Sequence, residues 1–139
     1  MKKRLLSFLL VLVILSSLTV VFASTRASQY LDSYGGVLGA DGDGVMTLSF
    51  TVNGTRRMDV VGAQEIVVEE KMGTRWFTYA IFSVEDYPEF YSYSKSSHDA
   101  DFSFNGVPGV TYRVVMTAYA ELNGGSDTGT VTISEETCT

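Results

Sequence analysis

The chain has 139 residues, of which 45% are hydrophobic, and its 16 Asp+Glu outnumber its 10 Lys+Arg, giving a formal net charge of −6 at pH 7. An acidic chain repels phosphate backbones, so the composition argues against nucleic acid as a partner. The single cysteine, Cys138, excludes an intramolecular disulfide, and a domain of about 116 residues buries enough surface to fold without one.

The N-terminus has the pattern of a targeting segment. Lys2-Lys3-Arg4 precede a nearly apolar run from Leu5 to Phe22, and Ala23 offers a small residue at the cleavage point. This pattern predicts a secretory signal peptide, residues 1–23, cleaved after Ala23. The alternative is an uncleaved membrane anchor, for which a run of 18 residues is just short of a comfortable span. We expect residues 24–139 to be secreted, with association to the cell surface as the alternative, and to have no membrane contact after cleavage.

Cleavage would also change the charge and leave the thiol unpaired. It removes three basic residues and no acidic one, so the mature net charge becomes −9. Such a charge favours solubility outside the cell. No cysteine stands directly after the apolar run, which argues against a bacterial lipid anchor. Cys138, the penultimate residue, could pair between chains. The favoured interpretation is a free thiol on a frayed end, because chain termini are usually mobile.

Short runs with period two dominate residues 24–139, which we interpret as one domain. Gly, Asn and Asp turns separate the runs, and Asn53-Gly54 is a strong turn signal. The inward residues of one run are predicted to be Met46, Leu48, Phe50 and Val52. Residues 58–62 suggest a short irregular crossing, and residues 85–97 are not assigned. Seven strands are predicted, at 29–38, 45–52, 65–71, 75–82, 100–104, 112–121 and 129–133.

The strand that begins at Tyr112 carries the clearest fold signal. Its alternation places Tyr112, Val114, Met116, Ala118 and Ala120 on one face. The reverse face then carries Arg113, Val115, Thr117 and Tyr119. A turn with Gly106, Pro108 and Gly109 comes just before the strand. A tyrosine at this place resembles the tyrosine corner of immunoglobulin-like sandwiches.

Two further segments carry a resemblance. The segment from Ile66 to Trp76 resembles the strand, turn and tryptophan hairpin of fibronectin type III-like modules. Gly109 to Val115, together with Gly124 to Asp127, is similar to small secreted Firmicutes proteins that have a signal peptide, one such domain and no assigned function. The similarity covers most of residues 28–133, and the tail Glu135–Thr139 departs from it. The resemblance implies an all-β, antiparallel two-sheet sandwich of the immunoglobulin/fibronectin III-like class, with an open barrel as the alternative.

Four local patterns suggest chemistry, and each has a simpler explanation. Asp127-Thr128-Gly129 is the aspartic-protease triplet, but it follows Gly-Gly-Ser rather than a burying strand, so a turn explains it better. Asp41 and Asp43 begin like a calcium loop, yet Val45 and Met46 stand where an oxygen ligand and a glycine are needed, which favours a hairpin turn. His98 with Cys138 is too small a set for zinc, and no serine is placed against it by sequence, so we interpret it as a polar loop residue. The acidic cluster of Glu85, Asp86 and Glu89 is interpreted as a solvated loop rather than as the carboxylate pair of a hydrolase.

Aromatic residues give the better binding hypothesis. Tyr87-Pro-Glu-Phe-Tyr-Ser-Tyr93 could expose flat rings that stack on sugars or anchor a protein, and Tyr119 could add to them. The alternative is that these tyrosines are half-buried in ordinary β structure. Asn53-Gly-Thr55 matches a glycosylation sequon, although a turn suffices to explain it.

The sequence therefore predicts a secreted, non-enzymatic binding or adhesion module without cofactor, metal or catalytic residues. An unidentified protein or a glycan is the expected partner. The alternative is a structural or self-associating surface protein, in which edge strands pair between copies and Cys138 locks a dimer.

Overall fold

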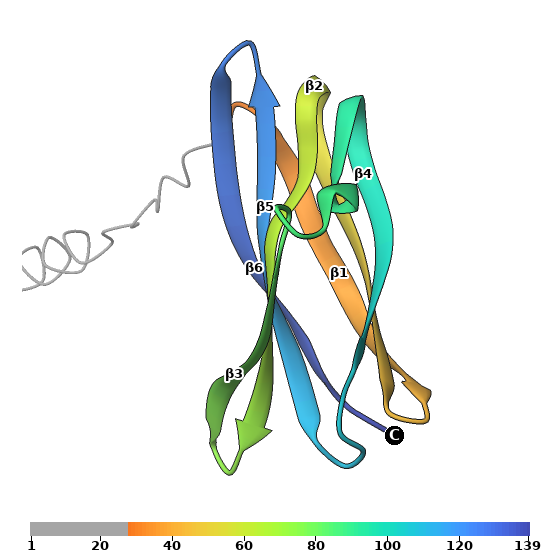
Figure 1. Cartoon of the computed structure of the whole chain (residues 1–139). Helices are drawn as coiled ribbons and strands as arrows, with labels where there is room; N and C mark the ends of the chain where they lie inside the picture. Colours follow the sequence, from red (N-terminus) through yellow and green to blue (C-terminus); the bar gives the residue numbers. More distant parts are fainter. Residues whose placement is uncertain (1–27) are drawn as a thin grey trace, which may run out of the picture.

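The computed structural model describes residues 28–139, which form six β-strands and one short 3-10 helix (Figure 1). The predicted signal peptide, residues 1–23, lies outside the described residues. All strand pairs are antiparallel, so the all-β prediction is confirmed. No helix within the described range is long and apolar enough to cross a membrane. The elements are β1 (Leu31–Gly42), β2 (Val45–Met72), β3 (Arg75–Ser83), η1 (Pro88–Phe90), β4 (Tyr91–Asn105), β5 (Thr111–Leu122) and β6 (Gly125–Thr137).

The long strand β2 is the centre of the sheet, because it pairs with β1, β3, β4 and β5. Its first half, up to Asn53, pairs with β1 and with the second half of β4. Its second half, from Met58, pairs with β5, with β3 and with the beginning of β4. Figure 1 shows the chain of β2 rising to one end of the molecule, turning over there and returning. One end of the core is therefore closed by a continuous strand rather than by a loop.

This continuity corrects the predicted strand count from seven to six. Asn53-Gly54 does not end a strand, because β4 pairs with β2 on both sides of residues 54–57, which form a bulge. The bulge is held by the start of the domain: Thr55 N donates to the Tyr30 carbonyl at 2.9 Å. Residues 58–62, predicted as an irregular crossing, belong to the same strand.

Other strands are longer than predicted because their partners extend them. β1 continues to Gly42, and Gly35 and Gly36 within it pair with Thr51 and Phe50 of β2. The segment 85–97, which the sequence left unassigned, contains η1 and the first half of β4. β6 begins at Gly125, so the turn before it is shorter than predicted.

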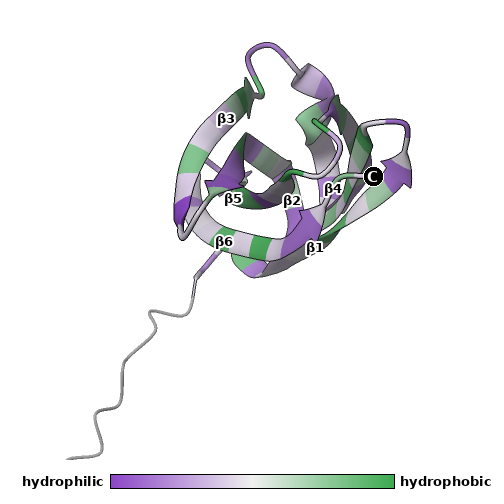
Figure 2. Cartoon of the chain, turned by 90° about the horizontal axis from the view of Figure 1, so that it is seen from below, coloured by the Kyte–Doolittle hydropathy of each residue, from purple (hydrophilic) through white to green (hydrophobic). Residues whose placement is uncertain are grey.

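The sheet curls around a core of alternating residues. The strand order is β1-β2-β5-β6, with β3 and β4 also paired to β2, and Figure 2 shows the curled strands in end view. Among residues 28–139 no hydrogen-bonded ladder joins β1 to β6. The predicted inward residues of β2 and β5 are all buried, with exposures between 0% and 3%. Those residues are Met46, Leu48, Phe50, Val52, Tyr112, Val114, Met116, Ala118 and Ala120.

Tyr112 joins the core to the turn that precedes its strand. Its ring is fully buried and packs against Tyr79 and Phe104, with ring centroids 5.0 and 5.8 Å away. Its hydroxyl accepts a hydrogen bond from Val107 N at 2.9 Å. The hydroxyl therefore bonds to the backbone five residues upstream, in the turn before β5. Tyr112 thus fixes the path of the chain between β4 and β5.

Candidate functional site

The outer face of β2, β3 and β5 carries the row of residues that the sequence places outside the core. Val115 of β5 pairs with Val67 of β2, and Val67 pairs with Ile81 of β3. Directly paired residues share a face of the sheet, so these three side chains form an apolar strip. Ile81 is 59% exposed. We call this surface the β5 face and define it by Glu65, Val67, Ile81, Glu85, Arg113, Val115, Thr117 and Tyr119.

At one end of the β5 face, two tyrosines from different strands meet over a glycine. Tyr91 and Tyr119 are both paired with Gly62, which has no side chain to separate them. Their rings stack with centroids 5.5 Å apart and an interplanar angle of 24°. Burial raises the pKa of Tyr91 to about 12, helped by the nearby Tyr119, Tyr93 and Glu121. The end of the face is therefore aromatic and unfavourable to additional negative charge.

In the middle of the β5 face lies a small acidic pocket. Its volume is about 400 Å³, and Thr117 of β5 forms part of its wall. Glu65 comes from β2, and Glu85 comes from the turn after β3. Within the described chain neither carboxylate belongs to an ion pair. The remaining lining residues are Gln64, Ser83 and Val84.

At the other end, the only tryptophan lies under two cations. Arg113 and Lys71 lie over the Trp76 ring, 4.4 and 5.4 Å from its centroid. Arg113 also pairs with Glu69 at 2.5 Å, and Lys71 pairs with Glu135 at 3.3 Å. Both cations are already engaged, so this end is a structural cluster.

The predicted aromatic run is divided between the core and the surface. Phe90 is 1% exposed and stacks on Tyr87 at 5.3 Å, and both rings contact Phe102. The hypothesis of an exposed patch is wrong for Phe90, which is buried at the end of η1, and Tyr87 is half-buried against Phe82 and Phe102. Tyr91 is half-buried, whereas Tyr93 is 63% exposed. Sequence reasoning missed the apolar strip at Val67 and Ile81, which a period-two reading of each strand could have found.

On the outer face of β1, β4 and the first half of β2, polar side chains form hydrogen bonds with one another. A shallow groove of about 700 Å³ runs past Gly35 and Val37. Its carboxylates accept hydroxyl bonds across the sheet: Ser49 donates to Asp101 and Thr51 to Asp99, both at 2.6 Å. These acids hold the strands together and offer few free acceptors.

The predicted calcium-like segment is a hairpin turn. Asp43 and Gly44 form the turn between β1 and β2, and Asp43 has a φ of 53°. Asp41 accepts a hydrogen bond from the Thr47 hydroxyl. Within residues 28–139, no three acidic, histidine or cysteine side chains lie close enough together to hold a metal ion. Of the three acids at 85–89, Glu85 lines the pocket of the β5 face, and all three side chains are exposed.

His98 is a core residue of β4 rather than a loop residue. It is 6% exposed, and its ring lies beside Phe50 with centroids 5.6 Å apart. Its Nδ1 lies 2.8 Å from Ser92 Oγ, a contact that the sequence did not predict, while its Nε2 is buried without a partner among the described residues. The contact is part-buried and joins two positions of β4.

His98 should make the domain less stable in mild acid. Burial lowers the pKa of His98 below its usual value, against a smaller opposing effect of Asp99, and Lys95 lowers it further. The unfolded chain then takes up the proton more readily than the folded one. The contribution of neutral His98 to the free energy of unfolding is therefore fully present above its pKa in the unfolded chain, about 6.5. The free energy of unfolding falls as the pH drops from there towards the pKa of His98 in the folded state, by at most about 1.4 kcal/mol per pH unit.

Urea unfolding at several pH values between about 5 and 7 tests this prediction, since carboxylates titrate mainly below that window. His98 is the only histidine of the chain, so His98→Gln should flatten the pH profile. The same slope in His98→Gln and the wild type would contradict the assignment.

Asp127 ties the beginning of the domain to β6. Its carboxylate accepts bonds from Ser28 Oγ at 2.6 Å, Gln29 N at 2.9 Å and Tyr30 N at 3.2 Å. The Ser28 hydroxyl and these backbone N–H groups lower the pKa of Asp127. The predicted turn is wrong here, because Asp127 lies inside β6. The carboxylate serves as an acceptor that anchors the chain before β1.

The C-terminal segment is anchored as well, which corrects the interpretation of Cys138. The thiol is 1% exposed, and Cys138 N donates to the Val110 carbonyl at 2.9 Å. Thr139 accepts a bond from Gly44 N at 2.9 Å. The end is not frayed, and the thiol packs in the core.

The sequon residues are also engaged in the fold. Asn53 Nδ2 donates to Ser33 Oγ at 3.0 Å, and the Thr55 hydroxyl donates to the Gln29 carbonyl at 2.8 Å. They lie where β2 turns over, between its two halves. Their contacts hold β1 against this bend.

Comparison of the chain with models of protein families, with curated proteins and with solved structures found no match.

Proposed function

We propose that residues 24–139 are a secreted, non-enzymatic binding module with an immunoglobulin/fibronectin III-like fold. The β5 face is its contact surface, and an extracellular protein or glycan is its partner. The observation that carries the proposal is the apolar strip of Val67, Ile81 and Val115, in which Ile81 is exposed and the two valines are partly exposed. An apolar strip on a rigid sheet, with tyrosines at one end, is the composition of a recognition surface.

Strand pairing supports the sandwich class. β1 and the second half of β4 pair with the first half of β2, whereas β3, β5 and the beginning of β4 pair with its second half, and β6 pairs with β5. This division of partners between the two halves of β2 supports two groups of strands that would form the two layers of a small immunoglobulin-like domain. The Tyr112 hydrogen bond agrees with this class.

Arrays of extracellular proteins and glycans, probed with the mature domain, test the binding role. We expect Ile81→Ser to lose the signal, because it removes the exposed apolar centre of the β5 face. Val37→Ser is the matched control, since Val37 is 71% exposed on β1 and lies outside this face. A glycan partner would be revealed by loss of binding in Tyr91→Ala and Tyr93→Ala. Turnover of peptides or glycans that depends on His98 or Asp127 would overturn the proposal.

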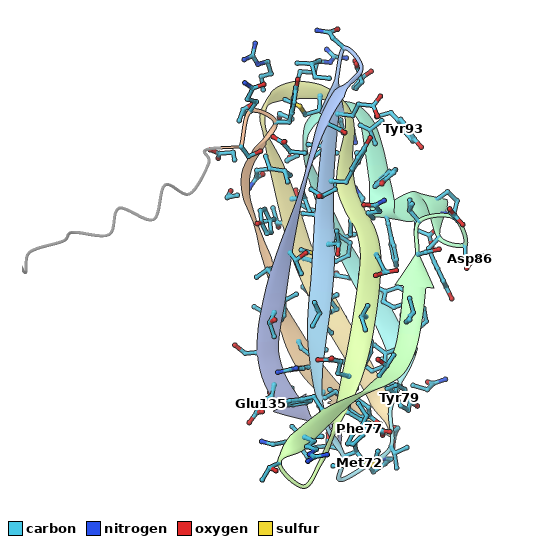
Figure 3. All side chains as sticks on the ribbon, turned by 90° about the vertical axis from the view of Figure 1, so that its left-hand side faces the viewer. Met72, Phe77, Tyr79, Asp86, Tyr93 and Glu135 are labelled. Carbon is cyan, nitrogen blue, oxygen red and sulfur yellow. The ribbon has the colours of Figure 1, made fainter. Side chains whose placement is uncertain are left out.

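Self-association is the second candidate, and the free edge of β3 favours it. Among residues 28–139, β3 pairs only with β2, and its Phe77 and Tyr79 side chains are 44% and 38% exposed. Figure 3 shows these two residues along β3, with Met72 at the adjoining turn. An exposed edge with apolar side chains can pair with a second copy. Burial of Cys138 removes the support for a disulfide-locked dimer. A strictly monomeric protein in light scattering excludes this candidate.

A further inference from the structure

We propose that the β5 face binds a cationic extended segment of an extracellular protein, with a Lys or Arg side chain entering the pocket between Glu65 and Glu85. The inference rests on the proposed binding function and adds the chemistry of the partner.

The pocket supplies the charge for such a partner. Glu65 and Glu85 line a space of about 400 Å³ on the β5 face. Among residues 28–139, neither carboxylate accepts a side-chain bond or an ion pair, in contrast to Asp99 and Asp101 on the opposite face. Carboxylates without internal partners keep their acceptor capacity for an incoming N–H donor.

The tyrosine end of the face also favours a cation. Thr117 of the pocket wall lies two positions along β5 from Tyr119, which stacks with Tyr91. The faces and oxygens of tyrosine rings attract cations electrostatically. The nearby Glu121 accepts a bond from the Tyr119 hydroxyl and adds negative charge. An anion would meet repulsion from both the pocket and this end.

The remainder of the face determines what flanks the cation. Two positions along β2 and β5 from the pocket, on the side away from Tyr119, the apolar strip is formed by Val67, Ile81 and Val115. This strip suits an aliphatic side chain of the bound segment. Beyond the strip, Arg113 is neutralised by Glu69. In an extended segment alternate side chains point the same way, so a basic residue and an aliphatic residue two positions apart would reach both places. The mature charge of −9 would attract such a segment from a distance.

Two synthetic probes test the inference on the mature domain. Both are fluorescein-labelled nine-residue peptides with serine at the even positions. At the odd positions valine alternates with lysine in one peptide and with glutamate in the other, so that a charged and an aliphatic side chain two positions apart lie on the same side of the extended chain. We expect fluorescence anisotropy to report binding of the lysine peptide alone. Affinity should fall between about 20 mM and about 150 mM NaCl, because salt screens exposed charges.

The variants separate the pocket from the overall charge. Glu65→Gln with Glu85→Gln should weaken binding of the lysine peptide about tenfold, as expected for loss of two charge contacts. Asp99→Asn with Asp101→Asn removes the same charge from the other face and should change affinity less than about twofold. Amide shift changes in NMR spectra should fall on Thr117 and Ile81.

Equal binding of the glutamate peptide, equal weakening by the two double variants, or shift changes on β1 and β4 would overturn the inference. The lysine peptide could fail to bind while the arrays still give a signal that Ile81→Ser abolishes. That result would reject the cationic partner but not the binding function. Failure of both experiments would reject both proposals.

Discussion

Replacing Gly62 by alanine is expected to lower the free energy of unfolding by about 3 kcal/mol, the upper end for overpacking a core position. Gly62 lies where β2 passes between Tyr91 of β4 and Tyr119 of β5. An alanine Cβ would overlap the Phe90 carbonyl oxygen and lie 3.0 Å from both Phe90 C and Tyr91 Cα. These are backbone atoms that cannot rotate away, so the start of β4 has to move from β2.

Thermal unfolding would reveal this cost as a decrease in Tm of roughly 10 °C or more. Gly35→Ala is the matched control, because a Cβ at Gly35 meets nothing within 4 Å. It should change stability by less than about 0.5 kcal/mol. An unchanged Tm in Gly62→Ala would contradict the close approach of β4 to β2. The variant should also separate Tyr91 from Tyr119 and bring the pKa of Tyr91 down, which absorbance titration of tyrosine measures.

The sequence could not have predicted this role for Gly62. Alternation is a local property, so it predicted the buried and outward residues of β5 correctly, from Tyr112 to Ala120. The role of Gly62 depends instead on Phe90, which is distant in sequence and lies on another element. The same reason explains why Asn53-Gly54 looked like a strand end. β2 continues through Asn53-Gly54 because β4 pairs with it on both sides of this dipeptide.

In the candidate site too, local features could be predicted from the sequence, whereas contacts between distant segments could not. The outward residues of β5 were predicted, because one strand suffices to place them. The pocket between Glu65 and Glu85 was not, since it requires β2 and the turn after β3 to meet beside Thr117. The aromatic run was misjudged because η1 breaks the period-two pattern and turns Phe90 inward. Single-strand patterns therefore identify surfaces, whereas pockets depend on pairings between distant segments.

A second large loss of stability is expected where β1 and the residue before it lie against β6 without a hydrogen-bonded ladder. The rings of Tyr30 and Tyr34 lie where side chains at Gly125 and Gly129 would be. A Cβ at Gly129 would come within 2.8 Å of Tyr34 Cε1, and a Cβ at Gly125 within 2.7 Å of Tyr30 Cζ. Each alanine substitution should cost about 1–2 kcal/mol, because the tyrosine must leave its place. The two sites are well separated along β6, so the costs should add and the double variant should lose about 2–4 kcal/mol.

Urea unfolding of a double-mutant cycle distinguishes this contact from a general intolerance of β6 to change. If the Tyr34 ring is the obstacle, Gly129→Ala should cost little in a Tyr34→Ala background, and the same should hold for Gly125→Ala with Tyr30→Ala. Strictly additive costs would show that the rings do not occupy these positions. Coupling at both pairs would assign the glycine of Asp127-Thr128-Gly129 to closing the fold, beside the bonds that Asp127 makes to the residues before β1. The triplet would then join β1 to β6 through a carboxylate and a glycine, which accounts for two of its three residues without catalysis.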